Sequence, residues 1–258
     1  MNVYRLFACL LGLSLCLVLS CKEETLQPLP DRLADYYPLE LNRPVYYRVD
    51  SVVLVRQVNG VRYDSSTTEA RETLLETFTG ADGVTYYRGE RWERPDPGYP
   101  YRFRQTFTVA RTNDGIVRSE DNLTFTKLVS PLREGVRWDG NKAFDELREI
   151  FAGGETVKVY EGWDYRYTNV DTTVTLRTGV QLDSVVTVRQ ADLNIQIDYR
   201  NAYEWYAPGI GLVERFVDAR HTQCEQCCDK DFFACADLGW NEKAEKGYIV
   251  RQTFLGRD

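Results

Sequence analysis

The residues of this sequence best suited to covalent or metal chemistry are four cysteines near its C-terminal end. Cys224, Cys227, Cys228 and Cys235 lie within twelve residues, in the spacing C-x2-C-C-x6-C. Thiols so close together can form disulfides, ligate zinc or act as a redox pair. His221 is the single histidine of the chain and extends the pattern to H-x2-C-x2-C-C. A zinc site would require these thiols to be reduced.

The N-terminal segment indicates that the chain is exported. Arg5 precedes residues 6–19, which are apolar except for a few small or polar residues. Such a run is too short to cross a bilayer as a stable helix and is typical of a signal peptide. It ends in VLSC at residues 18–21, which resembles a bacterial lipobox, in which the cysteine is lipidated and becomes the first residue. The resemblance implies a signal peptide at residues 1–20 and a lipid anchor on Cys21.

The residues after Cys21 indicate a location. Lys22-Glu23-Glu24 resembles the export signal that sends some Gram-negative lipoproteins to the outer face of the outer membrane. We therefore expect the partner of Cys21 to be outer-membrane lipid, with the protein at the cell surface; a periplasm-facing anchor is the second choice. Residues 21–35 contain two prolines and many charges, which predicts a flexible tether between the lipidated cysteine and a folded domain.

An exported chain meets an oxidising environment, so the four C-terminal cysteines predict two disulfides rather than a metal or redox site. A bond between the adjacent Cys227 and Cys228 is geometrically awkward. The open pairings are Cys224 with Cys228 or Cys235 and Cys227 with the remaining cysteine, or Cys224–Cys227 with Cys228–Cys235. One such bridge would stabilise the fold by about 3 kcal/mol. We expect no metal and no cofactor.

Composition and motifs argue against two function classes. The chain has 32 Lys and Arg and 39 Asp and Glu, a net charge of −7, whereas nucleic-acid binding requires a basic surface. With one histidine, already beside cysteines, a Ser-His-Asp triad is disfavoured, and no G-x-S-x-G, Walker or dinucleotide motif occurs. A glycosidase needs only two carboxylates, but the sequence cannot pair any of them. We expect no enzyme and no catalytic residues.

Alternating apolar and polar residues predict an antiparallel β domain over residues 36–258. Turn signals at Gly80–Gly83 and Thr112–Gly115 separate expected strands. Residues 142–151 (KAFDELREIF) alone have helical spacing, and Gly153-Gly154 would end that helix. The predicted fold is all-β, a single curved antiparallel sheet or open half-barrel with one short helix and a disulfide-stapled loop. The expected strands are 45–55, 74–78, 84–92, 101–109, 116–118, 123–129, 157–167, 185–188, 195–199, 212–217 and 248–254.

Two further resemblances concern the envelope. EWYAPGIGLV at residues 204–213 resembles a hairpin of uncharacterised envelope lipoproteins, some of which are similar to LolA-like half-barrel lipid carriers. It implies a curved sheet and envelope residence more firmly than lipid carriage. Asp-Ser-Val at 50–52 and 183–185 and Asp-Thr-Thr at 171–173 resemble O-glycosylation sites of some Gram-negative periplasms, which implies modification at Ser51, Ser184 and Thr172.

The function class that remains is a lipid-anchored cell-envelope lipoprotein acting as a non-enzymatic binding or interaction module. Its ligand would be a lipid, a glycan or a protein. The alternative is a structural or assembly subunit of an outer-membrane complex, for which an uncapped edge strand at residues 248–254 would serve. Trp138, in the turn-like segment 133–141, is the first candidate for stacking on a sugar, although packing inside the sheet is the default use of the five tryptophans.

Overall fold

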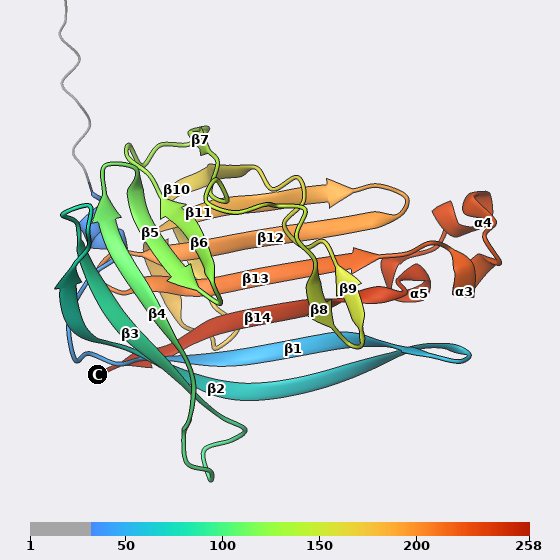
Figure 1. Cartoon of the computed structure of the whole chain (residues 1–258), viewed down its shortest axis with the longest axis horizontal. Coiled ribbons are helices and arrows are strands. Elements are labelled where there is room, and N and C mark those ends of the chain that lie inside the picture. The colour runs from blue at the N-terminus through green and yellow to red at the C-terminus, as the bar shows by residue number, and fades with distance from the viewer. Residues whose placement is uncertain (1–31) are drawn as a thin grey trace, which may run out of the picture. The chain divides into compact units, whose positions relative to one another are not determined.

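A sheet of twelve antiparallel strands dominates the computed structural model, which describes residues 32–258 (Figure 1). From one edge to the other, the strand order is β6-β5-β4-β3-β2-β1-β14-β13-β12-β11-β10-β7. The first and last strands of the described chain, β1 and β14, therefore pair in the middle of the sheet. Two further strands, β8 and β9, form a small separate sheet.

The elements have the following bounds. The large sheet contains β1 (Val45–Gln57), β2 (Gly60–Thr79), β3 (Thr85–Arg94), β4 (Arg102–Thr112), β5 (Gly115–Glu120), β6 (Leu123–Leu128), β7 (Arg137–Trp138), β10 (Tyr165–Thr175), β11 (Gln181–Asn194), β12 (Asp198–Ala207), β13 (Gly211–His221) and β14 (Lys246–Arg257). The small sheet contains β8 (Ile150–Ala152) and β9 (Glu155–Val157). The short helices of the described residues are α2 (Leu33–Tyr36), α3 (Glu225–Cys228), α4 (Phe232–Ala236) and α5 (Trp240–Lys243).

Strand β12 shows how the residue pattern forms these strands. Arg200, Ala202, Glu204 and Tyr206 are buried, whereas the side chains between them are partly exposed. Successive side chains of a strand point to opposite faces, so this alternation places the four residues on one face. Two of these four are charged, which shows that the inner face of the sheet is not purely apolar.

The sheet curls so that β5 and β6 lie over β11–β13, and the space between them is filled by an apolar core (Figure 1). Leu33 and Tyr36 of α2 are buried in this core, so the residues just before Tyr36 belong to the fold. The buried residues of this core come from both wings of the sheet, by which we mean β4–β6 on one side and β10–β13 on the other. The first wing contributes Phe107, Val109, Ile116 and Leu128, and the second contributes Tyr165, Tyr167, Val186, Val188 and Tyr206.

The two edges of the sheet meet without forming a ladder. The indole N–H of Trp138 donates to the carbonyl of Thr126 at 2.8 Å. The backbone N–H of Val129 donates to the hydroxyl of Tyr167 at 2.8 Å, and that hydroxyl donates to the carbonyl of Val129 at 2.7 Å. The sheet therefore stays open, which confirms the predicted single curved antiparallel sheet.

Glycine residues form the tight turns predicted between strands. The Gly80–Gly83 and Thr112–Gly115 turns both join antiparallel neighbours, β2 to β3 and β4 to β5. Gly115 has φ of +122°, and a Cβ atom there would lie 2.0 Å from the carbonyl oxygen of Leu128. Only glycine fits this close approach of two backbones.

The predicted helix at residues 142–151 is wrong. These residues form turns that lead into β8. The apolar spacing that indicated a helix has another cause: Phe144 packs on Phe125 and Tyr160 at ring-centroid distances of 5.2 and 5.3 Å, whereas Leu147 and Phe151 are exposed. The short helices of the described chain lie elsewhere.

The predicted edge strand at residues 248–254 is also wrong. Strand β14, which contains it, is paired on one side with β1 and on the other with β13. A strand between two partners has no free backbone groups to pair with another protein. Within residues 32–258, no helix is long and apolar enough to cross a membrane.

The close approach at Gly115 can be tested by comparing two glycines. Gly83 also has positive φ, +78°, but nothing lies within 4 Å of its virtual Cβ atom. We expect Gly83→Ala to lower the free energy of unfolding by about 1 kcal/mol through backbone strain alone. Gly115→Ala should lower it by about 3 kcal/mol because a steric clash adds to the strain. Urea unfolding followed by tryptophan fluorescence measures both; equal losses would show that the clash is relieved by a small backbone shift.

Candidate functional site

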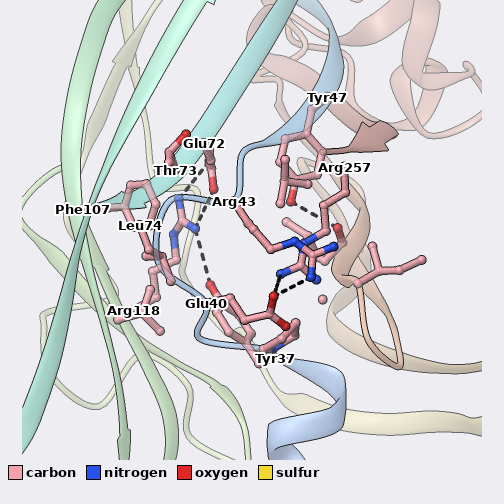
Figure 2. Close-up of a pocket in the computed structure, with 16 residues that line it drawn as sticks. Tyr37, Glu40, Arg43, Tyr47, Glu72, Thr73, Leu74, Phe107, Arg118 and Arg257 are labelled. Carbon is pink, nitrogen blue, oxygen red and sulfur yellow. Dashed lines mark hydrogen bonds and ion pairs between the residues drawn. The ribbon is translucent and has the colours of Figure 1, made fainter. Parts of the chain in front are cut away.

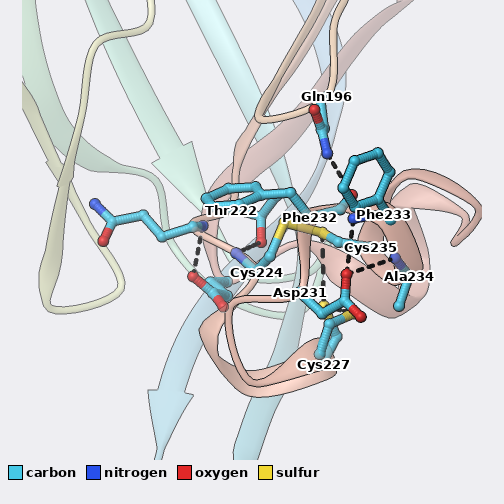
Figure 3. The surroundings of a disulfide bond; sticks show 12 residues. Gln196, Thr222, Cys224, Cys227, Asp231, Phe232, Phe233, Ala234 and Cys235 are labelled. Atoms are coloured by element: carbon cyan, nitrogen blue, oxygen red, sulfur yellow. Dashed lines mark hydrogen bonds between the residues drawn. A yellow bond between two sulfur atoms is a disulfide. The ribbon is translucent and has the colours of Figure 1, made fainter.

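The cysteine-rich segment lies beyond the end of β13, at residues 222–245, and we call it the distal knob (Figure 3). A disulfide joins Cys224 to Cys235, one of the pairings left open by the sequence. Cys227 and Cys228 are thiols. The expectation of two bridges is therefore not met at these two residues. Cys235, whose Sγ lies 3.7 Å from that of Cys227, is already bonded to Cys224, and Cys228 is the chain neighbour of Cys227, with which a bond is geometrically awkward.

The other sequence-predicted positions are dispersed. His221 is not part of the cysteine cluster, and its Nδ1 lies 2.9 Å from a carboxylate oxygen of Asp198. Among the proposed O-glycosylation positions, the hydroxyl of Ser51 is 2.8 Å from that of Ser66, and the hydroxyl of Thr172 donates to the carbonyl of Val185 at 3.3 Å.

Ser184 has φ of +55°, and like Ser51 and Thr172 it is half-buried within a strand. All three stay predictions as modification sites. Cys21, the predicted lipidation site, lies outside the described residues. Trp138 packs on Tyr167 at a ring-centroid distance of 4.7 Å, so it serves the core rather than a sugar.

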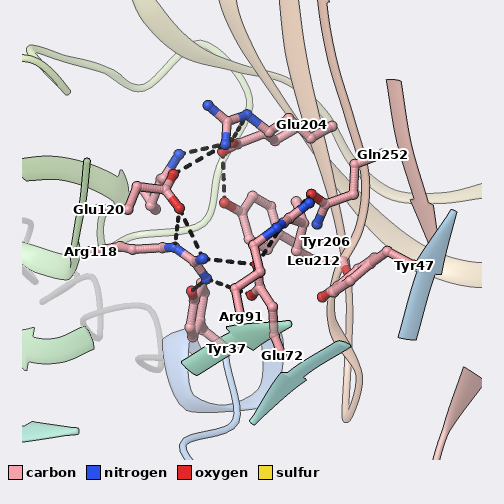
Figure 4. Close-up of polar contacts among 12 residues, drawn as sticks. Tyr37, Tyr47, Glu72, Arg91, Arg118, Glu120, Glu204, Tyr206, Leu212 and Gln252 are labelled. Atoms are coloured by element: carbon pink, nitrogen blue, oxygen red, sulfur yellow. Dashed lines mark hydrogen bonds and ion pairs between the residues drawn. The ribbon is translucent and has the colours of Figure 1, made fainter. Parts of the chain in front are cut away.

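A network of charged side chains lies on the inner face of the curled sheet, and we call it the ion network (Figure 4). Its centre is Arg118 of β5, whose guanidinium donates to both carboxylate oxygens of Glu72 at 2.9 and 3.0 Å. The same guanidinium donates to Glu120 at 2.9 Å. Arg91 donates to Glu72 at 2.9 Å and to the amide oxygen of Gln252 at 2.8 Å. These bonds join β2, β3, β5 and β14.

A second part of the ion network reaches the opposite wing. Lys127 of β6 forms an ion pair with Glu204 of β12 at 2.8 Å, and Tyr206 donates to the same carboxylate at 2.7 Å. Arg215 of β13 donates to Glu120 at 3.1 Å. Lys127 and Glu204 are almost fully buried, with side-chain exposures of 4% and 1%. Buried charges of this kind are tolerated only when each has a partner.

The buried carboxylates of the ion network are held ionised. Burial alone would raise the pKa of Glu120, but Arg118 and Arg215 outweigh it and hold the pKa far below its ordinary value. Burial likewise opposes ionisation of Glu72 and Glu204, and their basic neighbours still lower both pKa values. A carboxyl that donates a proton in catalysis needs a raised pKa. These three therefore act as fixed negative charges.

A hollow of about 380 Å³ opens beside the ion network on the inner face of the sheet. Its volume falls within the roughly 300–1,000 Å³ typical of ligand sites. Its lining includes three charged residues of the ion network, Arg91, Glu120 and Arg215, together with aromatic rings and amides. The other lining residues are Glu93, Arg104, Gln105, Asp121, Leu123, Phe125, Tyr160, Val217, Tyr248, Val250 and Gln252.

A second hollow of about 550 Å³ adjoins the first, and Gln105, Glu120 and Asp121 are in the lining of both. Its lining includes Phe78 and Phe103, with exposures of 45% and 53%. We call the two hollows together the binding groove. The first hollow has charged and polar groups in its lining and the second has the exposed aromatic rings, and the strands that line them come from both halves of the sequence.

Two other spaces are less suited to a ligand. The pocket under residues 37–45 holds about 60 Å³, and the ion pairs of Glu40 with Arg43 and Arg257, at 2.6 and 3.1 Å, lie at it (Figure 2). That volume is below the range of ligand sites. A hollow of about 610 Å³ beside α2 has one charged residue in its lining, Arg111, and does not adjoin Glu120 or Arg215.

The residues of the binding groove carry no signal in the sequence. Phe78 and Phe103 are strand aromatics like many others in the chain, and Arg91 and Gln252, which bond to each other, are 161 residues apart. Only the strand order, which brings β14 beside β1 and curls β5 over β13, places them together.

Comparisons with known proteins give little further guidance. No family model matches the chain, and no curated protein matches it. The chain is similar to a solved protein of Bacteroides fragilis described as a "putative exported protein with YMCC-like fold". The identity is 8%, the TM-score is 0.35, and the alignment covers 86% of this chain and 98% of that one. A similarity at this TM-score does not indicate a shared function.

The ion network can be tested through Glu120. Replacing Glu120 by Gln leaves Arg118 and Arg215 without their shared charge, which should lower the free energy of unfolding by about 3–5 kcal/mol at pH 7. The folded-state pKa of Glu120 is lowered. The higher free energy of unfolding of the wild type is therefore fully present above about pH 4.3, the pKa of an unfolded glutamate. It is lost as the pH falls towards the folded-state pKa.

Urea unfolding at pH 7 and at pH 3 measures this difference. Glu76→Gln is the matched control, because Glu76 pairs with Arg88 but has 60% of its side chain exposed; it should change stability by less than about 1 kcal/mol. Equal effects of the two variants would contradict a structural role for the ion network.

Proposed function

We propose that this chain is a lipid-anchored lipoprotein of the cell envelope that binds an elongated, hydroxyl-rich ligand, of the saccharide-chain class, in the binding groove. The observation that carries the proposal is the pair of adjoining hollows that share Gln105, Glu120 and Asp121. A ligand that occupied both hollows would be a chain of several units rather than one compact molecule. The charged residues of the groove act as fixed hydrogen-bonding groups and not as catalysts.

The chemistry of the lining favours hydroxyl groups. An arginine side chain only donates hydrogen bonds and an ionised carboxylate only accepts them, whereas a hydroxyl does both. Arg91, Arg215 and Glu120 therefore offer complementary partners to neighbouring hydroxyls of one ligand. The exposed rings of Phe78 and Phe103 would contact the apolar faces of sugar rings.

An acyl chain and a strand-pairing partner are less favoured. The resemblance to LolA-like carriers would imply a lipid cargo in an apolar concave space, but here residues such as Phe107, Val109 and Tyr165 fill that space. The remaining hollows are bordered by charges, which an acyl chain would have to desolvate. Assembly through a free edge at residues 248–254 is excluded because β14 is paired on both sides.

The proposal predicts that Phe103 contributes to ligand binding but little to folding. Phe103→Ala should weaken binding about tenfold, since a lost aromatic contact is worth about 0.5–1.5 kcal/mol. Phe233→Ala is the matched control, because Phe233 is 91% exposed and belongs to the distal knob. Arrays of purified oligosaccharides identify a ligand, and calorimetry then compares the wild type with the two variants.

Two results would count against the saccharide proposal. If Phe103→Ala and Phe233→Ala weaken binding of the array ligand equally, the ligand binds outside the groove. No binding to any oligosaccharide, together with binding to an extended peptide, would assign the groove to protein recognition instead.

The anchor is a separate part of the proposal and has its own test. Cells fed radioactive palmitate should label the wild-type chain, and Cys21→Ser should abolish the label and leave the chain unprocessed. Cys16→Ser is the matched control, since Cys16 lies within the predicted signal peptide. Protease treatment of intact cells then distinguishes surface display from a periplasm-facing anchor. Label retained in Cys21→Ser would contradict lipidation at this cysteine.

A further inference from the structure

The distal knob holds its cysteines in fixed positions. The disulfide ties Cys224, beyond β13, to Cys235 of α4. The carboxylate of Glu245, which is 5% exposed, accepts hydrogen bonds from the backbone N–H groups of Gln223 and Gln226, both at 2.8 Å. Buried carboxylate-to-backbone bonds of this kind order a loop that has little regular structure of its own.

Two thiols lie near this disulfide, and Figure 3 shows the nearer one to Cys235, that of Cys227. The Sγ atom of Cys227 lies 3.7 Å from that of Cys235, and the Sγ atom of Cys228 lies 2.7 Å from that of Cys227. The three sulfur atoms are all within 4.8 Å of one another. Both thiols are half-buried, so solvent and small reagents can reach them.

We propose that these residues form a thiol–disulfide exchange site, in which the thiolate of Cys227 attacks Sγ of Cys235. An S–S bond forms between Cys227 and Cys235, the bond between Cys235 and Cys224 breaks, and Cys224 leaves as a thiolate that takes up the proton lost by Cys227. The step conserves electrons and needs no external oxidant. Cys235 is the sulfur attacked because it is the disulfide sulfur within contact distance of Cys227.

The exchange has a structural consequence. Cys235 belongs to α4, whose Phe232 and Phe233 are 47% and 91% exposed. Bonded to Cys224, α4 is tied to the end of β13; bonded to Cys227, it would be tied to α3. The cysteine to which Cys235 is bonded therefore determines the position of Phe232 and Phe233. This inference does not depend on the binding groove.

The rate of exchange should depend steeply on pH. Burial, the neighbouring Cys228 and the charge of Glu245 raise the pKa of Cys227 to about 11. Only the thiolate attacks, and at pH 7 about one molecule in ten thousand carries it at this position. The exchange rate should rise about tenfold for each pH unit between 7 and 9, because the thiolate fraction does.

The test identifies which cysteines carry a free thiol after incubation. The purified chain with one disulfide is incubated at pH 7, 8 and 9, quenched in acid, alkylated, and its peptides are sequenced by mass spectrometry. We expect alkylated Cys224 to accumulate in the wild type and in Cys228→Ser, and to be absent in Cys227→Ser. Cys224 that stays unlabelled in the wild type at pH 9, or is labelled equally in Cys227→Ser, would overturn the proposal.

A second arm uses oxidation by oxidised glutathione. In Cys224→Ser we expect a Cys227–Cys235 bridge, with circular dichroism showing that the sheet is retained. In the wild type, bridges Cys227–Cys235 and Cys224–Cys228 support exchange, whereas Cys224–Cys235 with Cys227–Cys228 argues against it. A zinc ion retained on the native chain, detected by its mass, would also overturn the proposal, since the thiolates would then be ligands.

Discussion

The curl of the sheet depends on the ion network, because its bonds join strands that are far apart in the strand order. Glu120 with Arg215 connects β5 to β13, and Lys127 with Glu204 connects β6 to β12. Apolar contacts between the wings are non-directional and would allow them to slide. Arginine–carboxylate pairs fix both distance and angle. Replacing buried ion pairs by apolar residues is often neutral in stability, so the contribution of the ion network is to the geometry of the sheet. The same bonds fix the positions of the charged residues that line the groove.

The parts of this fold that could be predicted from sequence are those set by neighbours along the chain. The alternation in β12 and the turn glycines, such as Gly115, are local features that need no partner to be recognised. The segment 142–151 shows the limit of such arguments. Three apolar residues at helical spacing predicted a helix, but Phe144 is held by Phe125 and Tyr160, which lie in β6 and beyond β9. Tertiary packing determined the conformation of this short segment, because its local preference for a helix was weak.

The binding groove could not be predicted, for two physical reasons. First, charged residues in a strand usually face water, whereas Arg118 and Glu120 are both buried. Their burial is possible only because partners arrive from β2 and β13. Second, the pairing of β1 with β14 brings residues 45–54 beside residues 247–257, and no local pattern shows this. The cysteines were different, since all four lie in one short segment and their proximity was visible in the sequence.

The distal knob and the binding groove are mechanically separate. The α2 helix and the α3–α5 segment lie at opposite ends of the long strands (Figure 1). No residue of either segment lines the groove. Strands β13 and β14 pair continuously from Glu214↔Thr253 to His221↔Lys246, so the ladder continues up to the base of the knob. A change in the partner of Cys235 moves a helix of five residues beyond this ladder. The backbone hydrogen bonds of Arg215 and Gln252 lie within the ladder and are not broken, so the chain can alter its distal surface while the groove keeps its geometry.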